Sequence, residues 1–448
     1  MIKKYNYYLK LYDMVKKTRA KYYFDFFLST LSWSKEELNQ YRLSRLKSLL
    51  VYAYANCPYY RDSFARAGID ANDVLKINSL DYLKNLPVLT REDIQNHLDT
   101  LISVNKKQDT CFKGSSSGTT GIPITYYNGK DGFSAGMAAG YFCYTLSNWH
   151  IGDRSLHIWG NPTSIKNWNS FGSKIKRWVF QQKNLDATLL NDPTNYPRII
   201  AQINRFKPVS IDGYTSSIYN LARYLKENKV SIHRPNVMFT TAENLFPYQK
   251  ELIEETLAAV SDIYGCGEIN GIAAQPIYSN KYYIIEPHVI VETEYDSTAG
   301  LHEIIVTDLD NRAMPFIRYK IGDFIDPPQH GDDSDDIKFD FFTKIYGRNT
   351  DIIKLGNGKN ISAITIVGGT AFRQINGIIK HKVIWDGEYL HFIFEINEHF
   401  NLSLALQKIR ESICEYESDI KFKIEPVTRI LPDKTGKFNY FENKQVQQ

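Results

Sequence analysis

The sequence predicts an α/β protein in which a large N-terminal domain of β-sheets flanked by helices precedes a small, mobile α/β C-terminal domain. Three observations lead to this fold class. The first 105 residues have mainly helical periodicity, residues from about 110 to 325 alternate short β-rich runs with helical stretches, and the composition changes after residue 348. The expected domains are therefore residues 1–348, of which 1–105 are mainly helical, and residues 349–448.

The N-terminal part contains helix-forming periodicity and recognisable helix boundaries. Apolar residues recur at helical spacing at Leu43, Leu46, Leu50 and Ala53. The segment 56–58, Asn-Cys-Pro, should end that helix. Thr90, followed by Arg-Glu-Asp, is typical of a helix N-cap with acidic residues in the first turn.

The central part has the rhythm of a parallel or mixed sheet. The expected strands are the runs SLHIWG, VSIDGY, VMFTTA, DIYGCG and EIIVTDL. The expected helices between them cover Pro197–Arg205, Ser216–Glu227 and Pro247–Ala259. In such sheets, ligands gather at the carboxyl ends of the strands.

The last hundred residues predict a small α/β unit. The runs ISAITIV and HFIFEI are expected as strands, Leu404–Glu417 as a helix, and FKIEPVTRIL as a final strand. The acidic run HGDDSDD at 330–336 lacks the glycine and terminal glutamate of an EF-hand loop, so we interpret it as solvated surface.

The overall composition narrows the function classes. The formal net charge of +4 over 448 residues gives no electrostatic argument for nucleic-acid binding. Five widely spaced cysteines without a CxxC pair argue against a disulfide framework, and no signal peptide or apolar run of membrane-spanning length is evident. We expect a soluble, cytoplasmic protein. The Lys- and Tyr-rich N-terminus is compatible with contact to a membrane surface or partner, and also with an ordinary amphipathic helix on the core.

The most informative stretch is SSSGTTGIPI at 115–124. Small residues allow backbone N–H groups to surround an anion, and hydroxyl groups add donors. The residues expected to bind phosphate here are Ser115, Ser116, Ser117, Gly118, Thr119 and Thr120. A flexible Ser/Gly turn is the alternative. Residues 114–118 also match GxSxG, but the serine hydrolase elbow needs a helix directly afterwards, and Gly121 and Pro123 oppose one.

Two motifs in the central part could bind the base and a metal. In Tyr264-Gly265-Cys266-Gly267-Glu268, a tyrosine at a strand end can stack on a purine, and the glutamate oxygens can hold Mg²⁺. In TTAENL, the segment with Ala242 and Glu243 could line an adenine pocket. The alternatives are a common turn for the first motif and a helix N-terminus for the second.

Three later motifs complete an ordered set. Asp323, after a glycine at a strand end, can accept two ribose hydroxyls, whereas the nearby Arg318 is equally suited to a structural ion pair. Arg348 stands where the composition changes, which makes its surroundings a candidate hinge. Lys437, after a Gly turn near the C-terminus, could reach a carboxylate or an α-phosphate, or be merely solvated.

Taken together, these five motifs in this order resemble the adenylate-forming enzymes that include acyl-CoA synthetases. Within them, the chain looks most like the phenylacetate–coenzyme A ligase branch and its CapK-type relatives in polysaccharide biosynthesis. The segments NCPYYRDSF, LPVLTREDI, WHIGDRSL, IVTDLDNRAMPFIRYKIGDF and IYGRNTDIIKLGNGKNIS carry the same resemblance. It covers nearly the whole chain and implies the adenylate-forming enzyme fold.

The resemblance implies a reaction in two halves. A carboxylate attacks the α-phosphate of ATP to give acyl-AMP and pyrophosphate, and an acceptor, often coenzyme A, then displaces AMP. The 115–120 loop would bind the β- and γ-phosphates, Tyr264 would stack near adenine, and Asp323 with Arg348 would bind ribose. Glu268 would hold Mg²⁺, and Lys437 would bridge the carboxylate and the α-phosphate. The small domain would rotate between the half-reactions.

Some positions depart from the family pattern. Ile122-Pro123-Ile124 stands where a lysine often follows the phosphate loop, and Thr350 with Asp351 stands at the usual hinge aspartate. Residues 271–283 lack the Cys and His residues that some relatives carry, so we predict no zinc.

The acyl pocket should form near Phe133–Tyr141, Asp212–Ser216 and Thr240–Glu243. Tyr141 and Tyr214 could flatten it for an aromatic or planar acid, and Gly213 is expected to contact the substrate beside them. Asp212, if it points inward, could instead pair with a substrate amine; structural roles are the alternative. The substrate is left open among an aryl acid, an amino acid and a sugar-linked carboxylate.

The leading hypothesis is an ATP-dependent adenylate-forming ligase, acid–thiol or acid–amine, that serves capsular or surface polysaccharide biosynthesis. It would use ATP and Mg²⁺ and transfer the acyl group to coenzyme A, an amine or a sugar, with peripheral association to a glycan-assembly complex. One alternative is a phenylacetate-type aryl-CoA ligase that uses coenzyme A. An alternative of another class is a non-catalytic nucleotide-binding scaffold.

Overall fold

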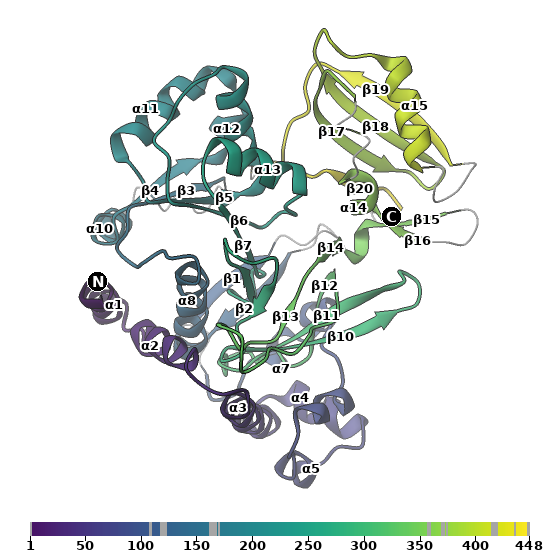
Figure 1. Ribbon diagram of the computed structural model, residues 1–448. Coiled ribbons are helices and arrows are strands. Elements are labelled where there is room, and N and C mark those ends of the chain that lie inside the picture. Colours follow the sequence, from purple (N-terminus) through teal and green to yellow (C-terminus); the bar gives the residue numbers. More distant parts are fainter. Residues whose placement is uncertain are drawn as a thin grey trace.

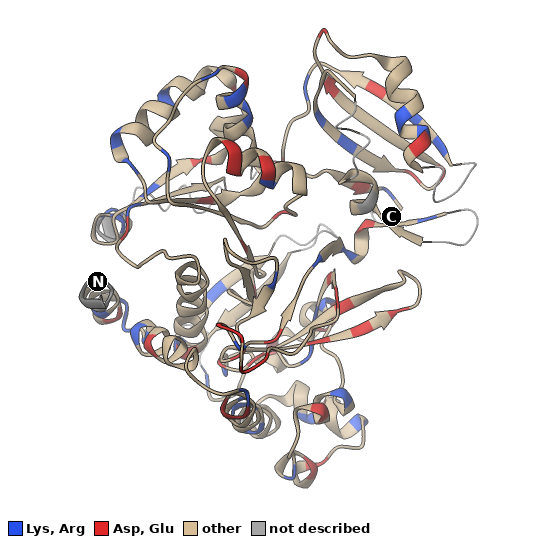
Figure 2. Cartoon of the chain, viewed as in Figure 1, with Lys and Arg blue, Asp and Glu red and all other residues tan. Residues whose placement is uncertain are grey.

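The computed structural model describes residues 2–106, 110–116, 123–160, 168, 171–355, 360–368, 372, 375–413, 420–433 and 436–445. Figure 1 shows a large domain of two main sheets with helices around them and a small domain, at the upper right, built on its own sheet. This is the predicted fold class. Lys and Arg segments are interspersed with Asp and Glu segments over both domains (Figure 2).

The first hundred residues are helical, as predicted. Their helices are α1 (Ile2–Lys16), α2 (Ala20–Thr30), α3 (Lys35–Asn56), α4 (Pro58–Arg66), α5 (Ala71–Leu75), α6 (Arg91–Asn96) and α7 (Leu98–Leu101). Helix α3 ends at Asn56, and Pro58 occupies the first turn of α4, where its missing N–H costs nothing. Thr90 forms a capping box with Asp93 at the start of α6, which confirms the predicted cap.

The larger sheet has eight strands in the order β13-β9-β8-β7-β6-β5-β3-β4. The strands are β3 (Ser155–Trp159), β4 (Gln182–Asp186), β5 (Ser210–Tyr214), β6 (Val237–Thr241), β7 (Val260–Tyr264), β8 (Ala273–Gln275), β9 (Tyr282–Ile284) and β13 (Phe341–Phe342). Strands β4, β3, β5, β6 and β7 are mutually parallel, and the rest are antiparallel. The mixed sheet is the one that the β-rich runs predicted.

Helices cover both faces of this sheet (Figure 1). They are α8 (Lys130–Thr145), α10 (Phe171–Val179), α11 (Tyr196–Phe206), α12 (Thr215–Glu227) and α13 (Pro247–Thr256). Side chains alternate along β6: Phe239 packs with α8 and α2, whereas Met238 packs with α11, α12 and α13. Helix α13 ends at Thr256, three residues before the predicted end, because the following residues lead into β7.

A second, antiparallel sheet has the order β10-β11-β12-β14 and packs on the N-terminal helices through one apolar cluster. Its strands are β10 (Val289–Asp296), β11 (Leu301–Asp308), β12 (Tyr319–Ile325) and β14 (Ile345–Arg348). The hairpin β1 (Phe112–Ser116) and β2 (Ile124–Asn128) flanks the predicted phosphate loop. Because Ser116 pairs with Ile124 in this hairpin, the chain returns as a strand, not as the helix that a serine hydrolase elbow requires.

The small domain has the sheet order β19-β18-β17-β20. Its elements are β15 (Ile352–Lys354), β16 (Asn360–Ser362), α14 (Ala363–Val367), β17 (Ile378–Trp385), β18 (Tyr389–Ile396), α15 (Leu402–Ile413), β19 (Lys421–Val427) and β20 (Phe441–Asn443). The prediction of one strand over ISAITIV is wrong: the run divides into β16 and α14, and α14 packs into the apolar cluster of the small domain. That cluster also contains Phe246 of the large domain. The boundary after residue 348 stays a prediction.

Candidate active site

The predicted site residues converge on the carboxyl edge of the parallel strands. Strands β3, β5, β6 and β7 end at Trp159, Tyr214, Thr241 and Tyr264. These ends lie side by side because the strands are neighbours in the sheet. Peptide chains leave a parallel sheet at this edge, so it forms the crevice in which α/β proteins bind ligands.

The hairpin β1–β2 brings the start of the predicted phosphate loop to Glu268. Ser115 is exposed on β1, and Ser116 Oγ donates a hydrogen bond of 2.7 Å to Glu268 Oε1. A guanidinium nitrogen of Arg91 lies 3.4 Å from Ser116 Oγ and 3.9 Å from Glu268 Oε1. Ser117, Gly118, Thr119 and Thr120 lie outside the described residues.

The oxygens of Glu268 and Ser116 fit the chemistry of a magnesium site. Mg²⁺ prefers oxygen ligands and is usually held by one or two carboxylates together with substrate phosphates and waters. Here a buried carboxylate and a hydroxyl meet beside a loop suited to phosphate. The nearby Arg91 adds a positive charge suited to phosphate oxygens. In the sequence, Arg91 is only the first residue of a helix, and its position beside Glu268 follows from tertiary packing.

Tyr264, Asp323 and Arg348 form a second cluster at the same edge. The hydroxyl of Tyr264 donates to Asp323 Oδ2 at 2.9 Å, and Arg348 Nε lies 3.7 Å from Asp323 Oδ1. Asp323 and Arg348 are register partners on β12 and β14. Burial raises the pKa of Asp323, although Arg348 and the Tyr264 hydroxyl oppose that rise. Gly265 follows Tyr264 at the end of β7. This cluster supplies a ring, a carboxylate and a guanidinium within one patch.

Glu243 joins the large domain to the small one. Its Oε2 accepts from Ser216 N at 2.7 Å, and its Oε1 accepts from Ser216 Oγ at 3.0 Å and from the backbone N of Phe438 at 2.8 Å. Ala242, just before it, has a left-handed backbone with φ of 67°, which costs free energy for a residue with a Cβ. Burial raises the pKa of Glu243, while the hydrogen bonds and Lys437 oppose that rise.

Lys437 is brought to the carboxyl edge by the turn that precedes it. Its backbone N donates to Asp433 Oδ1 at 3.0 Å, and Gly436 has φ of 83°, a conformation that favours glycine. The Nζ atom lies 5.4 Å from the centroid of the Tyr214 ring at the end of β5. Burial lowers the pKa of Lys437, and the neighbouring Glu243 carboxylate opposes that effect.

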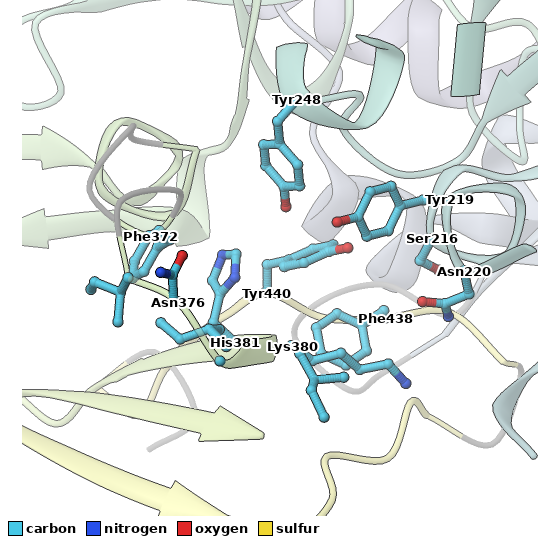
Figure 3. A pocket seen from close by; sticks show the side chains of 14 residues that line it. Ser216, Tyr219, Asn220, Tyr248, Phe372, Asn376, Lys380, His381, Phe438 and Tyr440 are labelled. Atoms are coloured by element: carbon cyan, nitrogen blue, oxygen red, sulfur yellow. The ribbon is translucent and has the colours of Figure 1, made fainter. Parts of the chain in front are cut away.

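A cavity of about 270 Å³ lies between the domains, and Phe438, next to Lys437, forms part of its wall. Figure 3 shows Tyr219, Tyr248 and Tyr440 around it, with Ser216 and Asn220 on the large-domain side and Lys380 and His381 on the small-domain side. Because residues of both domains form its walls, the shape of this cavity depends on how the two domains are arranged.

Of the four residues predicted for the acyl pocket, Tyr141 and Asp212 are near enough to interact electrostatically, whereas Gly213 alternates to the other face of β5. Tyr141 lies between Trp149 and Phe180, with ring centroids 5.9 and 6.2 Å away, and burial raises its pKa. A Cβ on Gly213 would meet the carbonyl oxygen of Ile158 at 2.5 Å, so this glycine permits close approach of β3 to β5.

Asp212 lies on the opposite face of β5 from Gly213, whereas Tyr214, the last residue of the strand, packs into the apolar cluster with Ile211 and Met238. Asp212 is buried against His157 of β3, which sequence analysis did not select. Alternating polar residues in SLHIWG were the only signal that could have drawn attention to His157.

Away from this edge, His288, Asp308 and Asp310 form the one group of potential metal ligands found in the described part of the chain. His288 Nδ1 and Asp310 Oδ2 are 2.8 Å apart, and Asp310 Oδ1 also accepts from Arg45 at 2.7 Å. Asp308 Oδ1 accepts from two backbone N–H groups. These partners satisfy both carboxylates and His288 Nδ1, as expected of a structural network.

No protein-family model matches the chain. Protein CapK from Staphylococcus aureus is 23% identical over 425 residues, which cover 91% of this chain and 89% of CapK. Phenylacetate-coenzyme A ligase from Escherichia coli K12 is 27% identical over 316 residues, covering 65% of this chain and 67% of the ligase.

Among solved structures, 2-hydroxyisobutyryl-CoA ligase in the postadenylation state aligns with a TM-score of 0.72 at 18% identity, covering 93% of this chain and 92% of the ligase. The same ligase in the thioesterification state aligns with a TM-score of 0.58 at 19% identity, covering 92% and 91%. The overall arrangement of this chain is therefore more similar to the postadenylation structure.

The chain has the fold of the adenylate-forming ligases and is similar in sequence to proteins of that class. Within this class, its relatives are the phenylacetate–coenzyme A ligases and CapK. The resemblance inferred from the motifs is confirmed.

Proposed function

We propose that this protein activates a carboxylic acid as an acyl-adenylate and transfers the acyl group to an acceptor. A carboxylate oxygen of the acid would attack the α-phosphorus of ATP, the bond to pyrophosphate would break, and the acceptor would then displace AMP. The observation that carries the proposal is the position of Lys437. Its Nζ lies over the Tyr214 ring at the carboxyl edge, where burial and, after it, the guanidinium of Arg348 in the cluster suited to ribose lower its pKa.

Each cluster supports a separate part of this reaction. A fixed ammonium at Lys437 would stabilise negative charge on the pentacovalent transition state and orient the two reactants. Ser115, Ser116 and Arg91 would bind the terminal phosphates, and Asp323 with Arg348 would bind ribose beside the Tyr264 ring. Mg²⁺ on Glu268 would supply charge neutralisation at the phosphates. The backbone of Ala242 and Glu243, together with Gly265, would line the adenine side.

The test is ATP–pyrophosphate exchange across aryl, amino and uronic acids with wild type and Lys437→Ala. We expect acid-dependent exchange that the variant loses by at least a hundredfold. Lys423→Ala is a matched control, because Lys423 also lies over a tyrosine ring in the small domain, 4.4 Å from the centroid of Tyr389 on another strand. Exchange by Lys437→Ala at the wild-type rate would refute the role of Lys437. Absence of exchange with every acid, despite ATP binding, would favour the non-catalytic scaffold.

The acceptor distinguishes the two enzymatic versions of the proposal. If the protein is a phenylacetate-type ligase, phenylacetate, ATP and coenzyme A should give an aryl-CoA thioester that mass spectrometry detects. If it serves surface polysaccharide assembly in the cytoplasm, an amino sugar should consume the acyl-adenylate instead. The similarity to CapK along nine-tenths of the chain favours the second version.

An exposed stripe on the N-terminal helix supports peripheral association with such an assembly. Tyr7, Lys10 and Met14 follow one another at helical spacing on α1, and Tyr7 and Met14 are 65% and 72% exposed. Trp178 on the adjacent α10 is 81% exposed. Aromatic and basic side chains together suit an interfacial helix. Within the part of the chain that the structure describes, none of the helices has the length and apolar character of a membrane span. Unchanged membrane fractionation after deletion of residues 1–20 would refute the association.

A further inference from the structure

The cavity between the domains has two polar side chains in its walls that are not paired within the described part of the chain. Asn220 lies on α12 of the large domain and is 8% exposed, and its side chain forms no hydrogen bond with a described residue. Lys380 lies on β17 of the small domain, and its ammonium group forms no ion pair with a described residue. Figure 3 shows both side chains at the end of the cavity beside Phe438.

Other polar groups in the walls differ, because their partners lie within the protein. Ser216 Oγ donates to Glu243 at 3.0 Å, and the Tyr440 hydroxyl accepts from Gln249 at 2.7 Å. Native proteins rarely leave a buried polar group unpaired, because the lost hydration is not replaced. The amide of Asn220 is therefore available to a ligand in the cavity.

A contact across the domain boundary brings Asn220 and Lys380 to the same part of the interface. Arg223, three residues after Asn220 on α12, donates a hydrogen bond to the carbonyl oxygen of Ile379, the residue before Lys380. Residues three apart on a helix lie on one face. The packing of α12 on β17 thus places an amide of the large domain and a cation of the small domain in one space.

The charges around Lys380 favour an anion. Burial lowers the pKa of Lys380, the carboxylate of Glu395 opposes that effect, and the guanidinium groups of Arg223 and Arg429 add to it. Glu395 already accepts a hydrogen bond of 2.8 Å from a backbone N–H, and the exposed Glu227 lies 3.7 Å from Arg223. An anion beside Lys380 would offset the desolvation of its ammonium group and the repulsion from the two guanidinium groups.

The rest of the cavity is aromatic and small. The ring centroids of Tyr219 and Tyr248 are 5.6 Å apart at 86°, and those of Phe438 and Tyr440 are 4.6 Å apart at 66°. Rings inclined in this way present both faces and edges, which suits a flat ring between them. The volume of about 270 Å³ lies just below the range of about 300–1,000 Å³ that is typical of ligand pockets. It suits a single ring with one attached group better than a nucleotide.

We propose that this cavity binds a small aromatic anion, a single ring that carries a carboxylate, sulfonate or phosphate group. The anionic group meets Lys380 and the Asn220 amide, and the ring lies among the tyrosines and Phe438. Because the walls come from both domains, such a ligand binds this domain arrangement and stabilises it according to its occupancy. The inference goes beyond the proposed adenylation and does not depend on it, since the cavity does not include Lys437.

The test is equilibrium binding by calorimetry with benzenesulfonate, an aromatic anion that has no carboxylate to be adenylated. Two comparison ligands separate its features. Benzenesulfonamide retains the ring and the shape but is neutral at neutral pH, and methanesulfonate retains the anion without the ring. We expect benzenesulfonate to bind about tenfold or more tightly than either, because the site supplies both a charge and an aromatic surface.

Two variants, one in each domain, test where the anion lies. Asn220→Leu retains the shape of the side chain without its amide, and Lys380→Met retains the length without the charge. Each should lower the affinity for benzenesulfonate about tenfold or more. Lys382→Met is the matched control and should keep the wild-type affinity. Lys382 lies two residues along β17, and its ammonium group is paired with Glu442 at 2.6 Å.

Lys437→Ala separates the cavity from the carboxyl edge and should keep the wild-type affinity for benzenesulfonate. Loss of binding in this variant would place the anion at the carboxyl edge and overturn the inference. Equal binding of the three ligands, or no binding of benzenesulfonate, would also overturn it. A loss in only one of the two domain variants would show a ligand held by one domain, against the proposal.

A further measurement serves if either variant does not fold. Hydrogen-exchange mass spectrometry of the wild type should show slower exchange in residues 375–381 with benzenesulfonate and no change with methanesulfonate. The same exchange with and without benzenesulfonate at saturating concentration would overturn the inference.

Discussion

Replacement of Glu243 by glutamine should slow adenylation selectively, because this carboxylate joins the two domains. Glu243 accepts three hydrogen bonds, two from Ser216 and one from the backbone N of Phe438, next to Lys437. Glutamine has nearly the same shape but offers one acceptor oxygen instead of two. Its amide nitrogen must face either the Ser216 N–H or the Phe438 N–H, and neither can accept a hydrogen bond.

The magnitude follows from the bonds that change. A hydrogen bond to a charged group contributes about 1.5–3 kcal/mol, and glutamine loses one to two of them. Part of this loss is offset, because burial raises the pKa of Glu243 and therefore already penalises its charge. A net cost of about 2–3 kcal/mol corresponds to a decrease of roughly 30- to 150-fold in the population with Lys437 in position. The first half-reaction should slow by that factor.

The assay compares the two half-reactions. ATP–pyrophosphate exchange reports the first, and transfer from a supplied acyl-adenylate to the acceptor reports the second. Only the first should respond to Glu243→Gln, since the contact with Phe438 belongs to the arrangement with Lys437 at the carboxyl edge. Glu255→Gln is the control, because Glu255 forms an exposed ion pair with Lys226. Wild-type exchange in Glu243→Gln, or equal slowing of both half-reactions, would refute the reasoning.

Three further predictions concern protonation and packing. Because burial lowers the pKa of Lys437, the rate of ATP–pyrophosphate exchange should fall in alkaline solution at a pH below the pKa of an ordinary lysine. Lys437→Arg should move this alkaline limb of the pH profile to higher pH. Burial raises the pKa of Asp351 from 3.8 to about 6, so the free energy of unfolding should decrease as the pH rises through that interval. Asp351→Asn should remove this pH dependence. In urea titrations at pH 7, it should raise the free energy of unfolding by about 1–2 kcal/mol. Gly213→Ala should lower the free energy of unfolding by about 1–3 kcal/mol, because its Cβ would meet the carbonyl oxygen of Ile158 at 2.5 Å.

Each of these has a clear contrary result. An alkaline limb that Lys437→Arg leaves in place would belong to another group. A pH dependence that persists in Asp351→Asn would exclude Asp351 as its source. An unchanged urea midpoint in Gly213→Ala would mean that β3 and β5 move apart to accept the new Cβ with little loss of folding free energy.

Local rules predicted much of the fold. The capping box at Thr90 and the helix end at Asn56 depend on hydrogen bonds and steric limits within a few residues, so they could be inferred without the rest of the chain. The run ISAITIV was misassigned because β-branched apolar residues suit a buried strand and a buried helix alike. Its packing into the apolar cluster of the small domain decided between them.

By itself, the sequence determined the class of protein, the order of its elements and the strand end that carries Tyr264, because those features depend on short patterns along the chain; Asp323 lies inside β12 instead of at its end. Only the tertiary structure decided that Arg91 lies beside Glu268, that Glu243 holds Phe438, and that His157 pairs with Asp212. Each of these pairs joins residues far apart in the chain. Their contact depends on strand register and on how the small domain packs against the large one, which no local pattern encodes.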